Sequence, residues 1–123
     1  MPAYEHAGFK PPAPVARAVV GAPDGSVEVQ DVAMLLDTGA DVSVIPRAVA
    51  DRLGITARLS GVRLQGYGGA QTEAAVADPR LDVLRYRFRG TFVVSTVEHG
   101  VLGRDVLNLL TVTLDGPPVT WSA

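Results

Sequence analysis

Short runs of apolar residues, separated by turn-forming residues, recur along most of the chain. Runs of roughly four to eight apolar or alternating residues are typical of β-strands, because helices need longer segments with a period of about 3.6 residues. Many short strands with turn signals between them predict an all-β domain, a small barrel or a sandwich-like fold. The expected strands are residues 15–21, 26–29, 32–36, 42–45, 62–67, 71–76, 81–84, 86–94, 111–114 and 119–121.

Two segments have helical character instead. Residues 46–53 begin with a proline and stop before Gly54, so they are expected to form about two helical turns. At about Gly103 the pattern changes from strand to helix, and the apolar residues that follow share one helical face: Val106, Leu107 and Leu110. This second segment is expected to be the main, C-terminal helix of the fold.

The distribution of prolines divides the chain into two parts. Four prolines within residues 1–14 disfavour a helix and a central strand, so this segment is expected to form an extended N-terminal arm. Residues 15–123 contain no linker-like stretch and are expected to form a single domain. A chain of 123 residues is long enough to bury one hydrophobic core without disulfides or metals.

The composition limits the classes of function. Apolar residues make up 47% of the chain and the net charge is −2, without runs of one sign, which argues against disorder and against nucleic-acid or membrane partners. The chain has no cysteine and its two histidines, His6 and His99, are isolated, so no metal or other cofactor is expected. The longest apolar run, residues 32–36, is too short to span a membrane, and no signal peptide is evident. A cytoplasmic location is therefore expected.

The first candidate for chemistry is Asp37, which is followed by Thr38 and Gly39 and lies between two apolar runs. The simple interpretation is an Asx-type turn that closes a strand. However, an ionised carboxylate between two buried segments is costly to desolvate, and sites that keep such a group usually use it.

The second candidate is the glycine-rich sequence GYGG, which consists of Gly66, Tyr67, Gly68 and Gly69 between two expected strands. It is either an ordinary hairpin turn or a mobile flap that the flanking strands carry over a cleft. Tyr67 either forms a hydrogen bond near a substrate or packs as an aromatic ring. The sequence leaves both alternatives open.

The third candidate is Arg104, at the expected corner between strand and helix and among apolar residues. A guanidinium group in such a position needs a carboxylate partner with bidentate geometry. Asp41, four residues after Asp37, is the candidate partner.

In this order and at these spacings, the three motifs resemble the retroviral-type (retropepsin-like) aspartic proteases. The sequence LLDTGAD is similar to the strand of that family that ends in Asp-Thr/Ser-Gly-Ala. GYGG follows about thirty residues later, like the flap of the family, and VLGRD about thirty-five residues beyond that, like its late helix start. The resemblance covers roughly residues 15–115.

The resemblance implies a small closed barrel with a flap hairpin and one C-terminal helix, and an aspartic endopeptidase in which Asp37 is catalytic. The mechanism needs two carboxylates that share a proton, so the single Asp-Thr-Gly implies a homodimer with Asp37 contributed by each subunit. Thr38 and Gly39 would support the site, and residues 66–69 would close over an extended peptide. Asp41 and Arg104 would form a structural or dimer-contact ion pair.

Two features of the termini depart from this pattern. Retroviral enzymes build much of their dimer contact from both termini, whereas here the arm is proline-rich and paired prolines at 117 and 118 interrupt the last strand. The dimer contact is therefore expected to be weak or differently built. Two alternatives remain open: a catalytically inactive peptide-binding or dimerisation module, and a structural β domain in which Asp37 only caps a turn.

Overall fold

Eleven strands and two short helices make up the computed structural model, which describes residues 2–65 and 71–123. None of the helices in these residues is long and apolar enough to cross a membrane. The helices are α1 (Arg47–Arg52) and α2 (Arg104–Leu107). The strands are β1 (Val15–Gly21), β2 (Glu28–Leu36), β3 (Val44–Pro46), β4 (Arg58–Gln65), β5 (Gln71–Ala77), β6 (Arg80–Val83), β7 (Tyr86–Arg89), β8 (Phe92–Ser95), β9 (Gly100–Leu102), β10 (Thr113–Asp115) and β11 (Thr120–Ser122).

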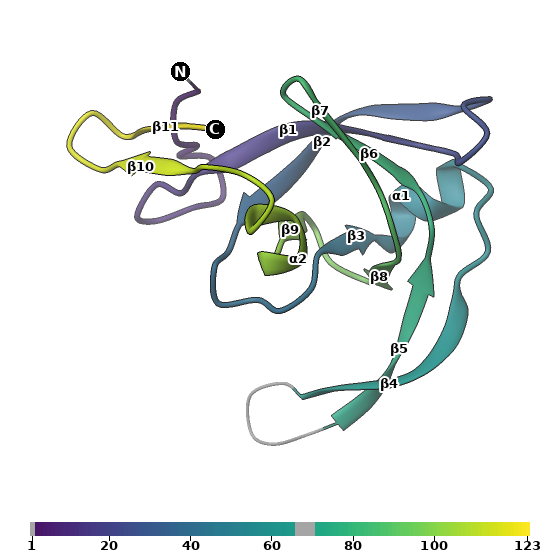
Figure 1. Cartoon of the computed structure of the whole chain (residues 1–123). Helices are drawn as coiled ribbons and strands as arrows, with labels where there is room; N and C mark the ends of the chain where they lie inside the picture. Colours follow the sequence, from purple (N-terminus) through teal and green to yellow (C-terminus); the bar gives the residue numbers. More distant parts are fainter. Residues whose placement is uncertain (1, 66–70) are drawn as a thin grey trace.

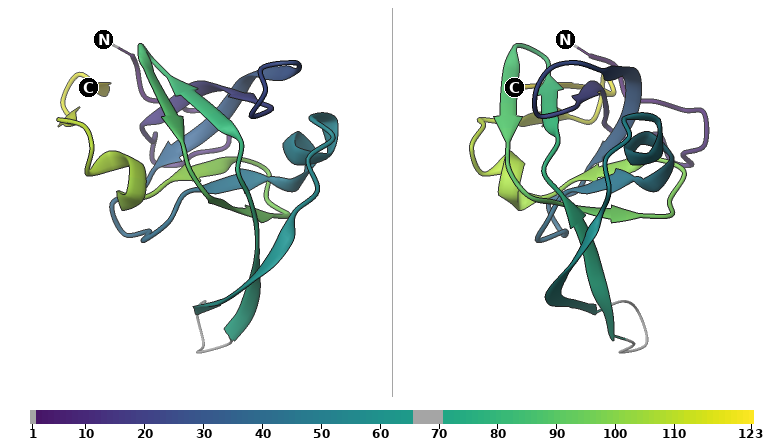
Figure 2. Two further views of the ribbon diagram at one scale, coloured as in Figure 1. Left: turned by 45° about the vertical axis from the view of Figure 1, so that its right-hand side comes forward. Right: turned by 90° about the vertical axis from the view of Figure 1, so that its right-hand side faces the viewer.

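Nine of the strands form one strongly curled sheet in the order β4-β5-β8-β3-β9-β2-β1-β6-β7 (Figure 1). Most neighbours are antiparallel, but β2 pairs with β9 and β3 pairs with β8 in parallel. The order has two ends, and within the described residues no ladder joins β4 to β7. The predicted closed barrel is therefore not confirmed, and the sheet is a half-barrel (Figure 2).

The hydrophobic core lies inside the curl of this sheet. Alternate residues of β1 and β2 face inward, as expected for strands with one buried face. The largest side chains that are almost completely buried are Trp121, Met34, Ile45, Leu81 and Leu102. Four of these come from different strands of the large sheet and Trp121 comes from β11, which pairs with β10 in a separate small sheet, so the core depends on both sheets rather than on one hairpin.

Three elements differ from the sequence-based expectation. Residues 26–29 and 32–36 were predicted as two strands, but 28–36 form one strand with a bulge at which Asp31 has a φ of 58°. The strand predicted at 86–94 is divided into β7 and β8 at residues 90–91. The C-terminal helix is only one turn long, because it ends at Leu107, and Leu110 lies beyond it.

The two ends of the chain lie side by side (Figure 1). The N–H of Trp121 donates to the carbonyl of Pro2 at 2.9 Å, and the N–H of Tyr4 donates to the carbonyl of Val119 at 2.7 Å. Residues 2–4 therefore form an additional strand-like segment along β11. The sequence suggested that the paired prolines interrupt the last strand. Instead, residues 117–118 lie in the turn between β10 and β11.

Candidate active site

Asp37 directly follows β2, at the point where this strand runs parallel to β9. Leu36 is opposite Leu102, and the N–H of Asp37 donates to the carbonyl of Leu102 at 3.0 Å. The Asp37 side chain is half-buried, and the two residues after it, Thr38 and Gly39, are exposed. In a single chain the carboxylate is therefore only partly desolvated, in contrast to the expectation of a group enclosed by two buried runs.

The backbone after Asp37 forms a tight turn around its carboxylate. The N–H of Gly39 donates to Oδ1 of Asp37 at 2.9 Å, and the N–H of Ala40 donates to the Asp37 carbonyl at 3.2 Å. The local geometry is the Asx-type turn of the simple interpretation. A Cβ atom at residue 39 would lie 3.1 Å from Oδ1, so any larger residue would displace the carboxylate.

The loop of residues 37–43 packs against the backbone at the start of α2. A Cβ atom at Gly103 would lie 2.6 Å from the carbonyl carbon and oxygen of Val42, and 3.0 Å from the carbonyl oxygen of Ala40. The N–H of Arg104 donates to that same Ala40 oxygen at 2.9 Å. Only glycine permits this close approach of two backbone segments.

Arg104 holds the same loop with its side chain. Nη1 donates to the carbonyl oxygen of Thr38 at 2.7 Å, while Nη2 forms an ion pair with Oδ1 of Asp41. Asp41 is thus the carboxylate that contacts Arg104. The predicted bidentate geometry is wrong, because the second nitrogen binds a backbone carbonyl. Both side chains are exposed, at 44% for Arg104 and 82% for Asp41.

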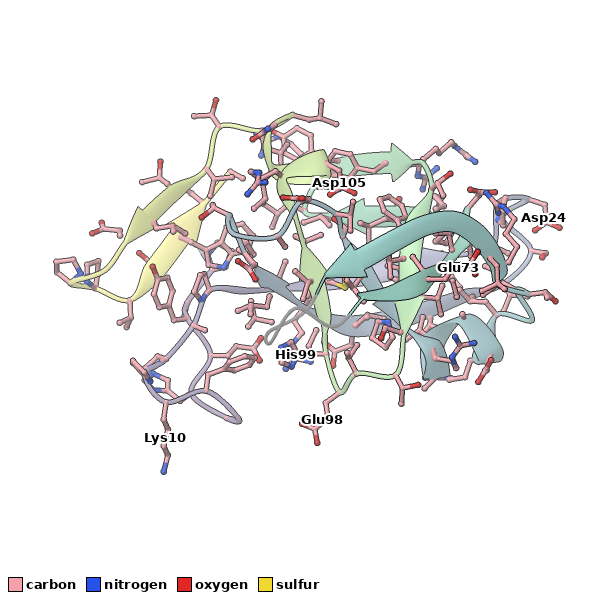
Figure 3. All side chains as sticks on the ribbon, turned by 90° about the horizontal axis from the view of Figure 1, so that it is seen from below. Lys10, Asp24, Glu73, Glu98, His99 and Asp105 are labelled. Atoms are coloured by element: carbon pink, nitrogen blue, oxygen red, sulfur yellow. The ribbon has the colours of Figure 1, made fainter. Side chains whose placement is uncertain are left out.

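Ser43 and Asp105 form a second, more buried link that the sequence reasoning missed. Oγ of Ser43, which is fully buried, donates to Oδ1 of Asp105 at 2.7 Å and accepts the N–H of Gly103 at 3.0 Å. The N–H of Ser43 donates to Oδ2 of Asp105 at 3.0 Å. Figure 3 shows Asp105 between α2 and the loop that follows β2. The sequence does contain a hint of this link: Ser43 lies between two valines, and a serine that is buried with such neighbours needs a polar partner.

The candidate flap residues, Gly66, Tyr67, Gly68 and Gly69, lie outside the described residues. Their flanking strands, β4 and β5, are paired up to Gln65 and Gln71 and extend away from the rest of the sheet (Figure 1). Both alternatives for Tyr67 remain predictions.

The isolated histidines have different surroundings. His99, which precedes β9, makes an edge-to-face contact with Phe9 of the N-terminal arm at a centroid distance of 5.0 Å (Figure 3). His6 is exposed. Within residues 2–65 and 71–123, no group of three or more metal-binding side chains is clustered.

Two comparisons with known proteins agree with this geometry. The sequence profile of the aspartyl protease family matches residues 22–106, which is more than half of the chain and includes Asp37 and Arg104. The structure is similar to that of the EIAV protease complexed with the inhibitor HBY-793, with a TM-score of 0.61 and 26% sequence identity, over 78% of this chain and 86% of that chain. The chain therefore belongs to the aspartyl protease family and is a retropepsin-like member of it.

Proposed function

We propose that the protein is an aspartic endopeptidase that is active as a homodimer and uses Asp37 of each subunit. The observation that carries the proposal is the position of the Asp37 carboxylate. It is half-exposed at the end of β2, and its Oδ1 accepts a hydrogen bond from Gly39 within a turn that α2 holds in place. A family member with one Asp-Thr-Gly sequence needs a second copy to supply the second carboxylate.

The chemistry follows from two carboxylates that share one proton. Two negative charges so close together repel each other strongly, so the pair holds one proton in common. The ionised carboxylate removes a proton from a water molecule, and the water oxygen bonds to the peptide carbonyl carbon. The protonated carboxyl donates its proton to the carbonyl oxygen. Breakage of the C–N bond then releases the amine, which takes up a proton from the pair, while one hydroxyl of the intermediate returns its proton to the pair and becomes the carbonyl of the new acid.

The neighbouring residues have supporting roles in this proposal. Thr38 and Gly39 hold the two Asp37 side chains in position, and the Asp41–Arg104 pair fixes the loop that carries them. An extended peptide would add as a strand beneath the flap formed by residues 66–69, whose closure would exclude water.

Replacement of Asp37 by asparagine tests the proposal. Asp37→Asn keeps the shape of the side chain and an oxygen for the Gly39 N–H, but it removes the acid–base function. We expect cleavage of a peptide library, followed by mass spectrometry, to fall by at least about 10²–10⁴-fold, with an unchanged circular dichroism spectrum. The matched control is Asp51→Asn, which changes an exposed aspartate on α1 and should leave cleavage unchanged.

Two results would contradict the proposal. If the Asp37→Asn variant still cleaves the peptide library, the Asp37 carboxylate is not catalytic. A wild-type protein that sediments as a dimer and binds peptides, but cleaves none of a broad library, would favour the inactive binding module instead.

A further inference from the structure

Within the residues that the structure describes, the small sheet formed by both ends of the chain has an unpaired edge at β10. Its strand order is residues 2–4, then β11, then β10, because Ala3 pairs with Thr120 on one side of β11 and Leu114 pairs with Trp121 on the other. Within residues 2–65 and 71–123, β11 is the one strand that pairs with β10. The outer edge of β10 is therefore open, in the sense in which edge strands recruit another chain.

The hydrogen-bonding groups of Leu114 point toward this open edge. The N–H of Trp121 donates to Pro2 and not to Leu114, so Leu114 and Trp121 form a non-hydrogen-bonded pair of the antiparallel ladder. In such a pair, the N–H and C=O of each residue are directed away from the partner strand. Leu114 thus presents one donor and one acceptor outward.

The side chain of Leu114 is also left without full cover. Residues directly opposite each other in a ladder share a face, so Leu114 lies on the face of Trp121, which is 2% exposed and part of the core. Leu114 itself is 51% exposed. The core face of the small sheet therefore continues beyond Trp121 and ends at a leucine that a further strand would cover.

We propose that β10 of a second copy of this chain pairs antiparallel with this edge, around a two-fold axis that passes between the two Leu114 residues. In this register Leu114 faces the partner's Leu114 as a hydrogen-bonded pair, which satisfies the outward donor and acceptor of both copies. Thr113 faces the partner's Asp115, so the two aspartates are not directly opposed. No proline or lysine interrupts the edge, because the prolines lie in the turn.

The position of this edge fits the requirement for two Asp37 residues, and to that extent the proposal rests on the proposed function. The β10–β11 hairpin and the loop between β2 and β3 lie on the same side of the molecule in Figure 1 and in the left view of Figure 2. A copy that docks on β10 would therefore lie on the same side of the molecule as the Asp37 loop. The terminal contact, which the sequence predicts to be weak or differently built, would then be a differently built one: each chain forms its own small sheet, and the two sheets join through β10.

A single cysteine at position 114 tests the register directly, because the natural chain contains no cysteine. The Cα atoms of a hydrogen-bonded pair are about 5.5 Å apart, within the range of about 4.4–6.8 Å that a disulfide spans. The matched control is Thr113→Cys, whose two copies would be roughly 8 Å apart in this register, too far for a disulfide. We expect Leu114→Cys, but not Thr113→Cys, to form a linked dimer under mild oxidation on a non-reducing gel.

A second pair of variants measures the contribution of the edge to association. Leu114→Lys places two ammonium groups opposite each other and should raise the dimer dissociation constant about tenfold or more in sedimentation equilibrium. The control is Leu84→Lys, at a leucine of similar exposure (48%) in the turn between β6 and β7. It should change the dimer dissociation constant by less than about twofold.

The outcomes separate this proposal from the proposed function. A wild-type protein that cleaves peptides and sediments as a dimer, together with a Leu114→Cys variant that links no better than Thr113→Cys, would overturn the β10 interface and leave the peptidase intact. Selective linkage at position 114 supports the interface whether or not the linked dimer cleaves peptides, because linkage reports contact and not catalysis.

Discussion

The hydroxyl of Ser43 donates a hydrogen bond to Oδ1 of Asp105 at 2.7 Å, although the two residues are 62 positions apart in the chain. Oδ2 of the same carboxylate accepts the N–H of Ser43, and the hydroxyl accepts the N–H of Gly103. This arrangement joins the loop that carries Asp37 to the first turn of α2. The serine is fully buried, so its side of the link is sheltered from competition by water, whereas Asp105 itself is exposed.

Ser43→Ala should destabilise the protein by about 1–3 kcal/mol, because it leaves the N–H of Gly103 buried without its acceptor and removes one partner of Asp105. Chemical denaturation at neutral pH measures this loss. Peptide cleavage should fall as well, since the loop that holds Asp37 is no longer fixed. An unchanged midpoint of unfolding would show that the Ser43–Asp105 link does not stabilise the fold.

Gly103→Ala should destabilise the protein by about 1–3 kcal/mol or more, because the new Cβ atom would lie 2.6 Å from backbone atoms of Val42, so one of the two backbone segments must shift. The midpoint of thermal unfolding provides the measurement. The matched control is Gly90→Ala, where the nearest atom to the added Cβ is the ring of Phe92 at 3.8 Å, an ordinary contact. Equal stability of the two variants would contradict the close approach at Gly103.

Arg104→Lys should reduce cleavage more than it reduces stability. A lysine does not contact the Thr38 carbonyl and the Asp41 carboxylate in the way that the forked guanidinium does, so the Asp37 loop loses one of its two links to the Arg104 side chain. The pair is exposed, so the free energy of unfolding should change by no more than about 1 kcal/mol. The rate of cleavage should fall about ten- to a hundredfold, because small displacements of catalytic groups are costly.

The control for this variant is Arg87→Lys, which alters an exposed arginine that binds Asp82 with two nitrogen atoms, far along the sheet from Asp37. Cleavage by Arg87→Lys should match the wild type. If both lysine variants lose the same fraction of activity, Arg104 has no special role in positioning the loop.

The stability of the β6–β7 hairpin should depend on pH through Asp82. The hydrogen bond from Arg87 and the charge of Arg80 lower the pKa of this carboxyl below its ordinary value of about 3.9. A group whose pKa is lowered on folding stabilises the folded state above its unfolded-state pKa, and this contribution disappears as the pH falls through the lower, folded-state pKa.

We therefore expect Asp82→Asn to unfold more easily than the wild type at pH 7, by about 1–2 kcal/mol, because the buried Arg80 loses a charged partner. The difference between the two proteins should narrow below about pH 4. Denaturation curves at pH 7 and pH 3 test this prediction. The control, Asp51→Asn, changes an exposed aspartate of α1 and should leave the free energy of unfolding unchanged at pH 7 and at pH 3. If the difference between Asp82→Asn and the wild type is the same at both pH values, the ionised Asp82 carboxylate is not the cause of the destabilisation.

Local patterns in the sequence were sufficient for several parts of the molecule. The first strand and the helix after Pro46 lie where short-range rules place such elements, because each depends on residues a few positions apart. The proximity of Arg104 to Asp41 was also inferred, from a lone charge that needed a partner. The bulge at Asp31 was read as a break between strands, since an extra residue interrupts the apolar alternation in the same way as a turn.

The sequence by itself determined the strand-rich class and the order of the three motifs that mark the protease family, because these are properties of neighbouring residues. Only the tertiary structure decided that Ser43 meets Asp105 and that residues 2–4 lie along β11. It also decided that, among the described residues, no ladder closes the large sheet and no second strand pairs with β10. Each of these features joins segments that are distant in the chain. Their formation depends on how the whole core packs, and no local pattern encodes that.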